Sequence, residues 1–183
     1  MKFTPKASMY LFIQKGELQP VWQSAYDADI VNSAEEICDS VETLRQSSSI
    51  RMLDIGGGMG GISIGISKVL GVPVHTTIID GTDDLPYVVS RSSTFSSSDA
   101  AREFLEANGV GCSFEPNGKY DIVLSLRAWC FHFPASEYME LVRRHTDAGT
   151  PVVCDVRLGV DPPFSVQKMI REGSKCNRLL MLR

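Results

Sequence analysis

Short apolar runs alternate, from about residue 50 to the end of the chain, with longer stretches in which apolar residues recur at helical spacing. The apolar runs have the length and β-branched content of buried strands, which predicts a strand at each of them. These predicted strands cover residues 50–55, 74–79, 110–114, 120–126, 151–156 and 179–182. Strands that alternate with helices form a parallel sheet covered on both faces. The pattern therefore predicts an α/β fold with a doubly wound, mostly parallel sheet.

Capping signals and apolar spacing predict the helices between these strands. Ser33 and Glu36, three positions apart, form a capping box that predicts a helix start at Ser33. The spacing over residues 165–173 predicts a last short helix. The other predicted helices cover residues 60–70, 98–107 and 134–145. Residues 1–32 show no clear period, so we expect an N-terminal arm or lid there, followed by a single domain at residues 33–183.

Composition and charge narrow the range of functions. The chain has 183 residues, 43 % of them hydrophobic, with five cysteines and three histidines that lack metal-ligand spacing, so no metal site is expected. Its net charge is −4 and its pI about 5.4, whereas a domain built around nucleic acid is usually basic, so we expect no nucleic-acid partner. No apolar run approaches the ~20 residues of a membrane span, and no signal peptide is visible. We therefore expect a cytoplasmic protein without membrane contact.

Glycines crowd the junction between the first predicted strand and the helix that follows it. Residues 54–61 read Asp-Ile-Gly-Gly-Gly-Met-Gly-Gly. A strand that turns directly into a helix needs positive φ angles, which glycine adopts without strain, and missing side chains let a ligand approach the backbone. A P-loop is disfavoured because Ile62 stands where its lysine would be. Two patterns remain: the G-x-G-x-x-G of dinucleotide-binding proteins, which starts at Gly56, and D-x-G-x-G-x-G, which starts at Asp54.

Asp54 discriminates between these two patterns. Its carboxylate would repel the diphosphate of a dinucleotide and would attract a ligand that carries an ammonium and a sulfonium group. The segment resembles the first motif of the class I S-adenosylmethionine (SAM)-dependent methyltransferases. The resemblance implies a Rossmann-like methyltransferase fold and SAM as cofactor, with Asp54 holding the amino group of SAM. The glycines that would pass under the amino-acid part of SAM are Gly56, Gly57, Gly58 and Gly60.

A second acid follows the next predicted strand. Asp80 and Gly81 come directly after the run of residues 74–79, and a carboxylate at this position can accept hydrogen bonds from both ribose hydroxyls of a nucleoside. This feature suits a SAM site and a nicotinamide site equally. Asp80 and Gly81 are therefore predicted cofactor-binding residues, and an NAD(P)-binding oxidoreductase stays open as an alternative function.

The segment that begins in the predicted strand 120–126 resembles the part of the methyltransferase family that faces the methyl group and the acceptor. Ser125 would lie beside the cofactor, mainly through its backbone. His132 is the histidine placed to remove a proton from an oxygen acceptor, and Arg127 could bind an acidic group of the acceptor. These two are the predicted catalytic residues. Candidates for the wall of the pocket are Trp129, Phe131 and Phe133.

The resemblance implies a SAM-dependent methyltransferase that acts on a small molecule, with an oxygen acceptor slightly favoured. A catalytically silent SAM-binding or regulatory subunit is a further alternative. The family usually ends in an antiparallel pair of strands, whereas the 27 residues at 157–183 are expected to form one helix and one strand. We therefore expect a sheet truncated at its C-terminal edge, where a second copy of the chain or a partner protein could cover it.

Overall fold

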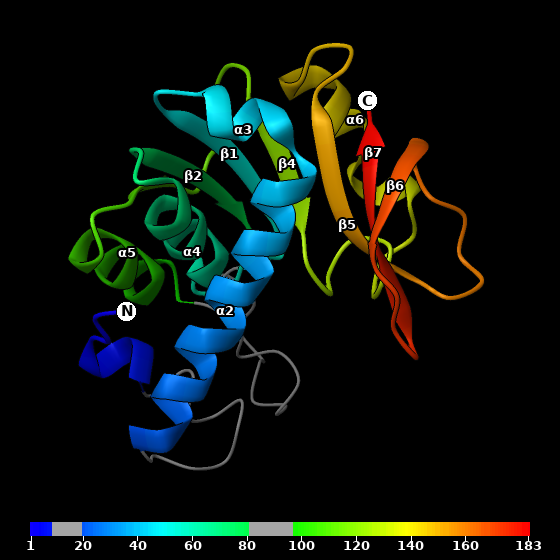
Figure 1. Cartoon of the computed structure of the whole chain (residues 1–183). Coiled ribbons are helices and arrows are strands. Elements are labelled where there is room, and N and C mark those ends of the chain that lie inside the picture. The colour runs from blue at the N-terminus through cyan, green and yellow to red at the C-terminus, as the bar shows by residue number, and fades with distance from the viewer. Residues whose placement is uncertain (9–19, 81–96) are drawn as a thin grey trace, which may run out of the picture.

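One sheet forms the centre of the molecule. The structure, a computed structural model, describes residues 1–8, 20–80 and 97–183, and within these ranges seven strands join that sheet (Figure 1). The strands are β1 (Ile50–Ile55), β2 (Val74–Ile79), β3 (Gly111–Ser113), β4 (Ile122–Ser125), β5 (Pro151–Arg157), β6 (Ser165–Arg171) and β7 (Cys176–Leu182). The helices are α2 (Pro20–Ser40), α3 (Glu42–Gln46), α4 (Gly61–Leu70), α5 (Ser98–Ala107) and α6 (Ser136–His145).

The strand order is β3-β2-β1-β4-β5-β7-β6. The chain adds strands on one side of β1 first and on its other side afterwards, so the topology switches at β1. The chain moves outward from β1 to β2 and β3, then returns to β4 on the other side of β1, and these strands and β5 are parallel. In open α/β sheets, ligands bind beyond the carboxyl ends of the strands at such a reversal. The fold therefore places the candidate site where β1 and β4 end, next to Gly56 and Ser125.

Two hydrophobic clusters cover the two faces of the sheet. Met52 of β1 belongs to the cluster that includes residues of α2, α4 and α5, whereas its neighbour Leu53 packs with Trp129 and with Val142 of α6. Side chains of a strand alternate between faces, so Asp54 lies on the same face as Met52. The carboxyl group of Asp54 is therefore directed toward the layer that contains α2 and α4.

α2 begins at Pro20, so the predicted helix start at Ser33 is wrong. Ser33 is buried inside the helix, and Glu36 pairs with Arg171 instead of capping, with 2.7 Å between Oε1 and Nη2. The helix extends further because its side packs along α4, an interaction that a capping pattern does not reveal. The predicted boundary at residue 32 falls inside α2, and the division into an arm and a domain stays a prediction.

The predicted helix at residues 165–173 and the predicted truncation of the sheet are also wrong, whereas the predicted strand at residues 179–182 is part of β7. Residues 165–171 form β6 instead of a helix, and β7 inserts between β5 and β6, so the sheet is not truncated. The register of β6 is irregular between Val166 and Lys168 and again between Met169 and Arg171. These two irregularities interrupt the alternation of side chains between the two faces of the strand. The apolar residues of β6 therefore have a spacing in the sequence that resembles that of a helix.

The remaining predicted elements are confirmed, with small shifts at their ends. β1 and β2 have the predicted bounds. The cap of α5 is Ser97, whose Oγ accepts a hydrogen bond from the backbone N–H of Ala100 at 3.3 Å. In the described part of the chain, none of the helices combines the length and the apolar character needed to pass through a bilayer.

Candidate functional site

The glycine loop joins β1 to α4 at the carboxyl edge of the sheet. Gly56, Gly58 and Gly60 have φ angles of 72°, 54° and 71°, a region that other residues rarely adopt. The backbone N–H of Gly60 donates to the carbonyl oxygen of Gly57 at 2.8 Å, which closes the turn. The alternating glycines of the D-x-G-x-G-x-G pattern are therefore the positions at which the backbone requires glycine.

Asp54 is a buried acid at the base of this loop. The residue is 1 % exposed, and no described residue gives its Oδ2 a hydrogen bond. A Cβ on Gly57 would lie 2.5 Å from that oxygen, so the absence of a side chain at Gly57 leaves room for the carboxyl group. Burial and the nearby Asp80 raise the pKa of Asp54 to about 7. No residue in the described ranges provides a positive partner for the charge of this carboxyl group.

Asp80 is brought to the same loop from the end of β2. Its Oδ2 accepts a hydrogen bond from the backbone N–H of Gly58 at 2.8 Å. The loop is also tied to β2 through its backbone, because the N–H of Gly56 donates to the carbonyl oxygen of Ile79 at 2.6 Å. The structure therefore brings together both predicted acids, whereas Gly81 lies outside the described residues.

Tyr26 of α2 reaches the start of α4 and was not predicted from the sequence. A Cβ on Gly61 would overlap the phenol oxygen of Tyr26. Burial, together with Asp54 and Asp29, raises the pKa of Tyr26 above its ordinary value. The sequence contains no local signal for this contact, because it depends on how α2 lies across α4.

Ser125 connects the end of β4 to the end of β1. Its Oγ donates a hydrogen bond to the carbonyl oxygen of Ile55 and accepts one from the backbone N–H of Trp129, both at 2.8 Å. The next residues also pack on the glycine loop, since a Cβ on Gly56 would overlap Cβ of Ala128. The side chain of Ser125 therefore fixes the loop after β4 beside the glycine loop.

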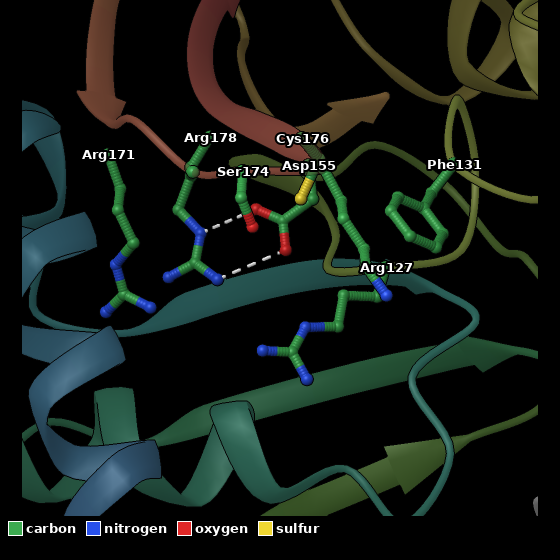
Figure 2. Close-up of a pocket in the computed structure, with 9 residues that line it drawn as sticks. Arg127, Phe131, Asp155, Arg171, Ser174, Cys176 and Arg178 are labelled. Carbon is green, nitrogen blue, oxygen red and sulfur yellow. Dashed lines mark hydrogen bonds and ion pairs between the residues drawn. The ribbon is translucent and has the colours of Figure 1, made fainter. Parts of the chain in front are cut away.

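A cavity of about 430 Å³ opens beside the loop after β4 (Figure 2). Its lining comes from the loop after β4, from β5, and from the ends of β6 and β7 with the turn between them. The charged residues of this lining are Arg127, Asp155, Arg171, Lys175 and Arg178, and Phe131 contributes an aromatic side chain. The predicted Arg127 thus belongs to a cavity with more positive than negative side chains.

A buried ion pair fixes one wall of the cavity. Asp155 of β5 lies directly opposite Arg178 of β7 in the antiparallel register. Oδ1 and Oδ2 of Asp155 accept hydrogen bonds from Nε and Nη2 of Arg178 at 2.8 and 3.2 Å. Glu36 of α2 adds a second acid, with Oε1 on Arg171 and Oε2 3.5 Å from Nη1 of Arg178. These residues were not predicted, although an acid inside the apolar run 151–156 is the same signal that identified Asp54.

The other predicted residues of the loop after β4 have different surroundings. His132 is exposed and is not among the residues that line the cavity, and its ring packs edge-on against Phe131 at 4.7 Å between ring centres. Trp129 is fully buried, and its Nε1 donates to the carbonyl oxygen of Ala135 at 2.9 Å. Phe133 is half exposed. Of the three aromatic candidates for the pocket wall, Phe131 lines the cavity and Trp129 belongs to the core.

Comparison with known proteins gives a structural likeness but no match in sequence. No family model matches the chain, and no curated protein matches it. An RNA methyltransferase from Salinibacter ruber, solved with S-adenosyl-L-homocysteine, is 18 % identical, with 84 % of this chain and 90 % of that chain covered at a TM-score of 0.50. A magnesium protoporphyrin IX methyltransferase from Synechocystis with bound SAM is 17 % identical, with 88 % and 79 % covered and a TM-score of 0.53.

A third solved structure belongs to a SAM-bound amino pentose methyltransferase from Micromonospora echinaspora. It is 17 % identical, with 90 % of this chain and 69 % of that chain covered at a TM-score of 0.51. The three are similar to this chain in fold and differ in the acceptors that their descriptions name. At this identity the likeness concerns the fold, and the chain has the Rossmann-like fold seen in class I SAM-dependent methyltransferases.

Proposed function

We propose that the protein is a methyltransferase that uses SAM and acts on a small molecule. The observation that carries this proposal is the buried carboxyl group of Asp54, whose Oδ2 has no hydrogen bond from a described residue. A buried acid is unfavourable in its charged form unless a positive group pairs with it. An ammonium group at the glycine loop would provide that pairing, and a diphosphate would be repelled.

The residues around the loop fit SAM. Asp54 would hold the amino group, and the backbone of the glycine loop at Gly56 and Gly58 would contact the amino-acid part. Asp80, fixed to Gly58 through Oδ2, would accept hydrogen bonds from the ribose hydroxyls. Ser125 would contribute through its backbone, because its side chain already bonds to Ile55 and Trp129. When bound, SAM would supply an electrophilic methyl group.

The chain itself would align the acceptor and exclude water, which is the main requirement of an in-line displacement at carbon. Arg127 would bind the acceptor from its place in the cavity. For an oxygen acceptor, which remains our preferred class, His132 would remove the proton. His132 is exposed on the same loop, so this role requires the acceptor to reach beyond Phe131.

The cavity volume supports a small-molecule acceptor. Sites for small molecules measure about 300–1,000 Å³, and the cavity beside the loop after β4 measures about 430 Å³. The structurally similar enzymes are described as acting on RNA, a porphyrin and an amino pentose, so the fold leaves the acceptor open. That the protein works in the cytoplasm stays a prediction from the sequence.

Calorimetric titration with SAM, S-adenosylhomocysteine and NAD tests the cofactor. We expect both sulfur compounds to bind and NAD to give no heat of binding. NAD binding without SAM binding would make the protein a dinucleotide-binding oxidoreductase instead. Transfer of a labelled methyl group from SAM to the small-molecule fraction of a cell extract then tests catalysis. SAM binding without any transfer would favour the silent regulatory subunit.

A further inference from the structure

The cavity beside the loop after β4 has an excess of positive charge that its own ion pairs do not balance. Asp155 pairs with Arg178, and Glu36, from α2, pairs with Arg171. Arg127 and Lys175, the other two cations of the lining, form no ion pair or hydrogen bond through their side chains with any residue in the described ranges. The lining therefore presents two unpaired cations beside two neutralised pairs.

Arg178 belongs to the buried wall of the cavity. The residue is 5 % exposed, and its Nη1 is buried without a hydrogen bond among the described residues. Oε2 of Glu36 lies 3.5 Å from Nη1 and is likewise buried without a hydrogen bond among the described residues. Nη1 and Oε2 of Glu36 are therefore charge partners inside the wall of the cavity. A ligand in the cavity would meet the exposed side chains of Arg127 and Lys175 instead.

The backbone holds Arg127 in an unusual conformation. Its φ is 60°, a left-handed value that is uncommon for a residue with a long side chain. Such strain persists when the surrounding structure enforces it, and it concentrates at functional sites. Figure 2 shows Arg127 entering the cavity from one side, while Arg171 and Arg178 enter from the opposite side. The three guanidinium groups thus face a common space.

The same loop links this space to the candidate cofactor site. Ala128 follows Arg127 and packs on Gly56, and Ser125 bonds to the end of β1. The loop that carries Arg127 into the cavity is therefore fixed to the glycine loop at two points. Guanidinium groups are planar and bind carboxylates and phosphates through two parallel hydrogen bonds.

We propose that this cavity binds the methyl acceptor and that the acceptor is a small molecule carrying a carboxylate or phosphate group, which Arg127 and Lys175 bind. This proposal rests on the proposed function, because it assigns the acceptor of that reaction. The pairs Asp155–Arg178 and Glu36–Arg171 hold the wall in place.

The first test uses inorganic phosphate and acetate as probes. The arginine Nε–H resonances of ¹⁵N-labelled protein are followed during each titration, at constant ionic strength maintained with chloride. We expect the Arg127 resonance to shift to saturation with at least one probe. Arg127→Gln and Lys175→Gln should each weaken binding roughly 10- to 100-fold, the usual effect of losing a hydrogen bond to a charged group. Arg144→Gln, at an exposed position of α6, is the matched control and should bind as the wild type does.

The second test follows labelled methyl groups from SAM into the small-molecule fraction of a cell extract. We expect the labelled product to be retained on an anion-exchange resin, and phosphatase treatment then separates phosphate from carboxylate acceptors. SAM binding with no response to either probe, or with label in neutral products, overturns this proposal and leaves the proposed function intact. Probe binding without SAM binding overturns the proposed function and the acceptor role together. Label in RNA overturns the small-molecule acceptor.

Discussion

Asp54 is the residue on which the ligand site depends. In the absence of a ligand its burial favours the neutral form and raises its pKa to about 7, from an ordinary value of 3.8. Between these two values the folded protein holds a proton that the unfolded chain has released, so this group lowers stability as the pH rises and has no further effect above about 7. An ammonium ligand would reverse the balance, because it pairs with the ionised form.

The affinity for SAM should therefore depend on pH. We expect it to increase between pH 6 and 8 and to level off above that range, because binding ionises Asp54, whose pKa is about 7 in the ligand-free protein. Calorimetry in two buffers of different ionisation enthalpy measures the proton that is released on binding near pH 7. An affinity that falls over this range, or binding without proton release, would contradict the pairing of Asp54 with the amino group.

Asp54→Asn separates binding from folding. The amide retains the shape of the carboxyl group but cannot form the ion pair, so we expect SAM affinity to fall roughly 10- to 100-fold. Above pH 7 the unliganded variant should be at least as stable as the wild type, because no buried charge remains. Calorimetry and chemical denaturation measure the two effects. Asp161→Asn, at an exposed loop position, is the control and should change neither quantity.

Sequence reasoning found the residues that carry a local signal and missed those that depend on packing. Asp54 and Asp80 were identified because each acid ends an apolar run, and the structure brings both to the glycine loop. Tyr26 and Arg178 were missed because their contacts depend on the packing of α2 against α4 and on the register of β7 against β5. Such contacts join residues far apart in the chain.

At the scale of elements, the glycine loop illustrates how packing and ligand binding can require the same residue. Gly57 leaves room for the carboxyl group of Asp54, and Gly56 leaves room for Ala128. Most of the glycine run is therefore explained by contacts inside the protein. The glycines by themselves indicate a tight junction. What points to a ligand is Asp54, a buried acid whose Oδ2 receives no hydrogen bond from the part of the chain that the structure describes.

Gly56→Ala should destabilise the fold more than Gly71→Ala does. Both glycines have positive φ, 72° and 67°, but a Cβ on Gly71 meets nothing within 4 Å whereas one on Gly56 overlaps Ala128. The backbone strain costs about 1–2 kcal/mol in each variant, and overpacking adds about 1–3 kcal/mol at Gly56. Urea denaturation measures both free energies of unfolding. Equal losses would show that Ala128 moves aside freely.

The pairing of β5 with β7 contains a buried ion pair whose loss should be costly. Arg178→Leu leaves Asp155 buried and unpaired, and breaking such a pair destabilises proteins by about 3–5 kcal/mol. The double variant Asp155→Leu with Arg178→Leu should recover most of that loss, since no unpaired charge remains. Urea denaturation of the two variants checks this, and a double variant as unstable as the single one would refute the argument.

The elements themselves were predictable to different degrees. β1, β2 and β5 are buried apolar runs, so their composition alone identifies them. β6 is an exposed edge strand with an irregular register, so it shows neither a continuous apolar run nor a clean alternation. Short, buried strands are thus easier to predict than a bulged edge.

At the scale of the whole molecule, a contact with a second copy or a partner was predicted because the sheet was expected to be truncated, and the sheet is not truncated. β7 covers β5, so the sheet ends at β6 instead. The irregular register and the exposed Lys168 of β6 are features that protect edge strands from pairing. Val166 and Met169, which are 45 % and 50 % exposed, are the apolar side chains on β6 that a partner could cover.

Sedimentation velocity over a range of concentrations tests this contact. If a second copy covers β6, the wild type should associate, and Met169→Lys should shift it to the monomer without changing SAM affinity. Lys119→Gln, which alters an exposed ion pair with Asp147 in which no residue of β6 takes part, is a control that should sediment like the wild type. A wild type that stays monomeric at every concentration would contradict association through a second copy.

The position of β7 between β5 and β6 has a consequence for the order of events during synthesis. β6 leaves the ribosome before β7, yet β6 is joined to the rest of the sheet only through β7. Until β7 has emerged, β6 has no strand to pair with, and Asp155 on β5 lacks the arginine that neutralises it. The sheet can therefore be completed only in a late step, when the nascent chain inserts β7 between two strands that were made before it.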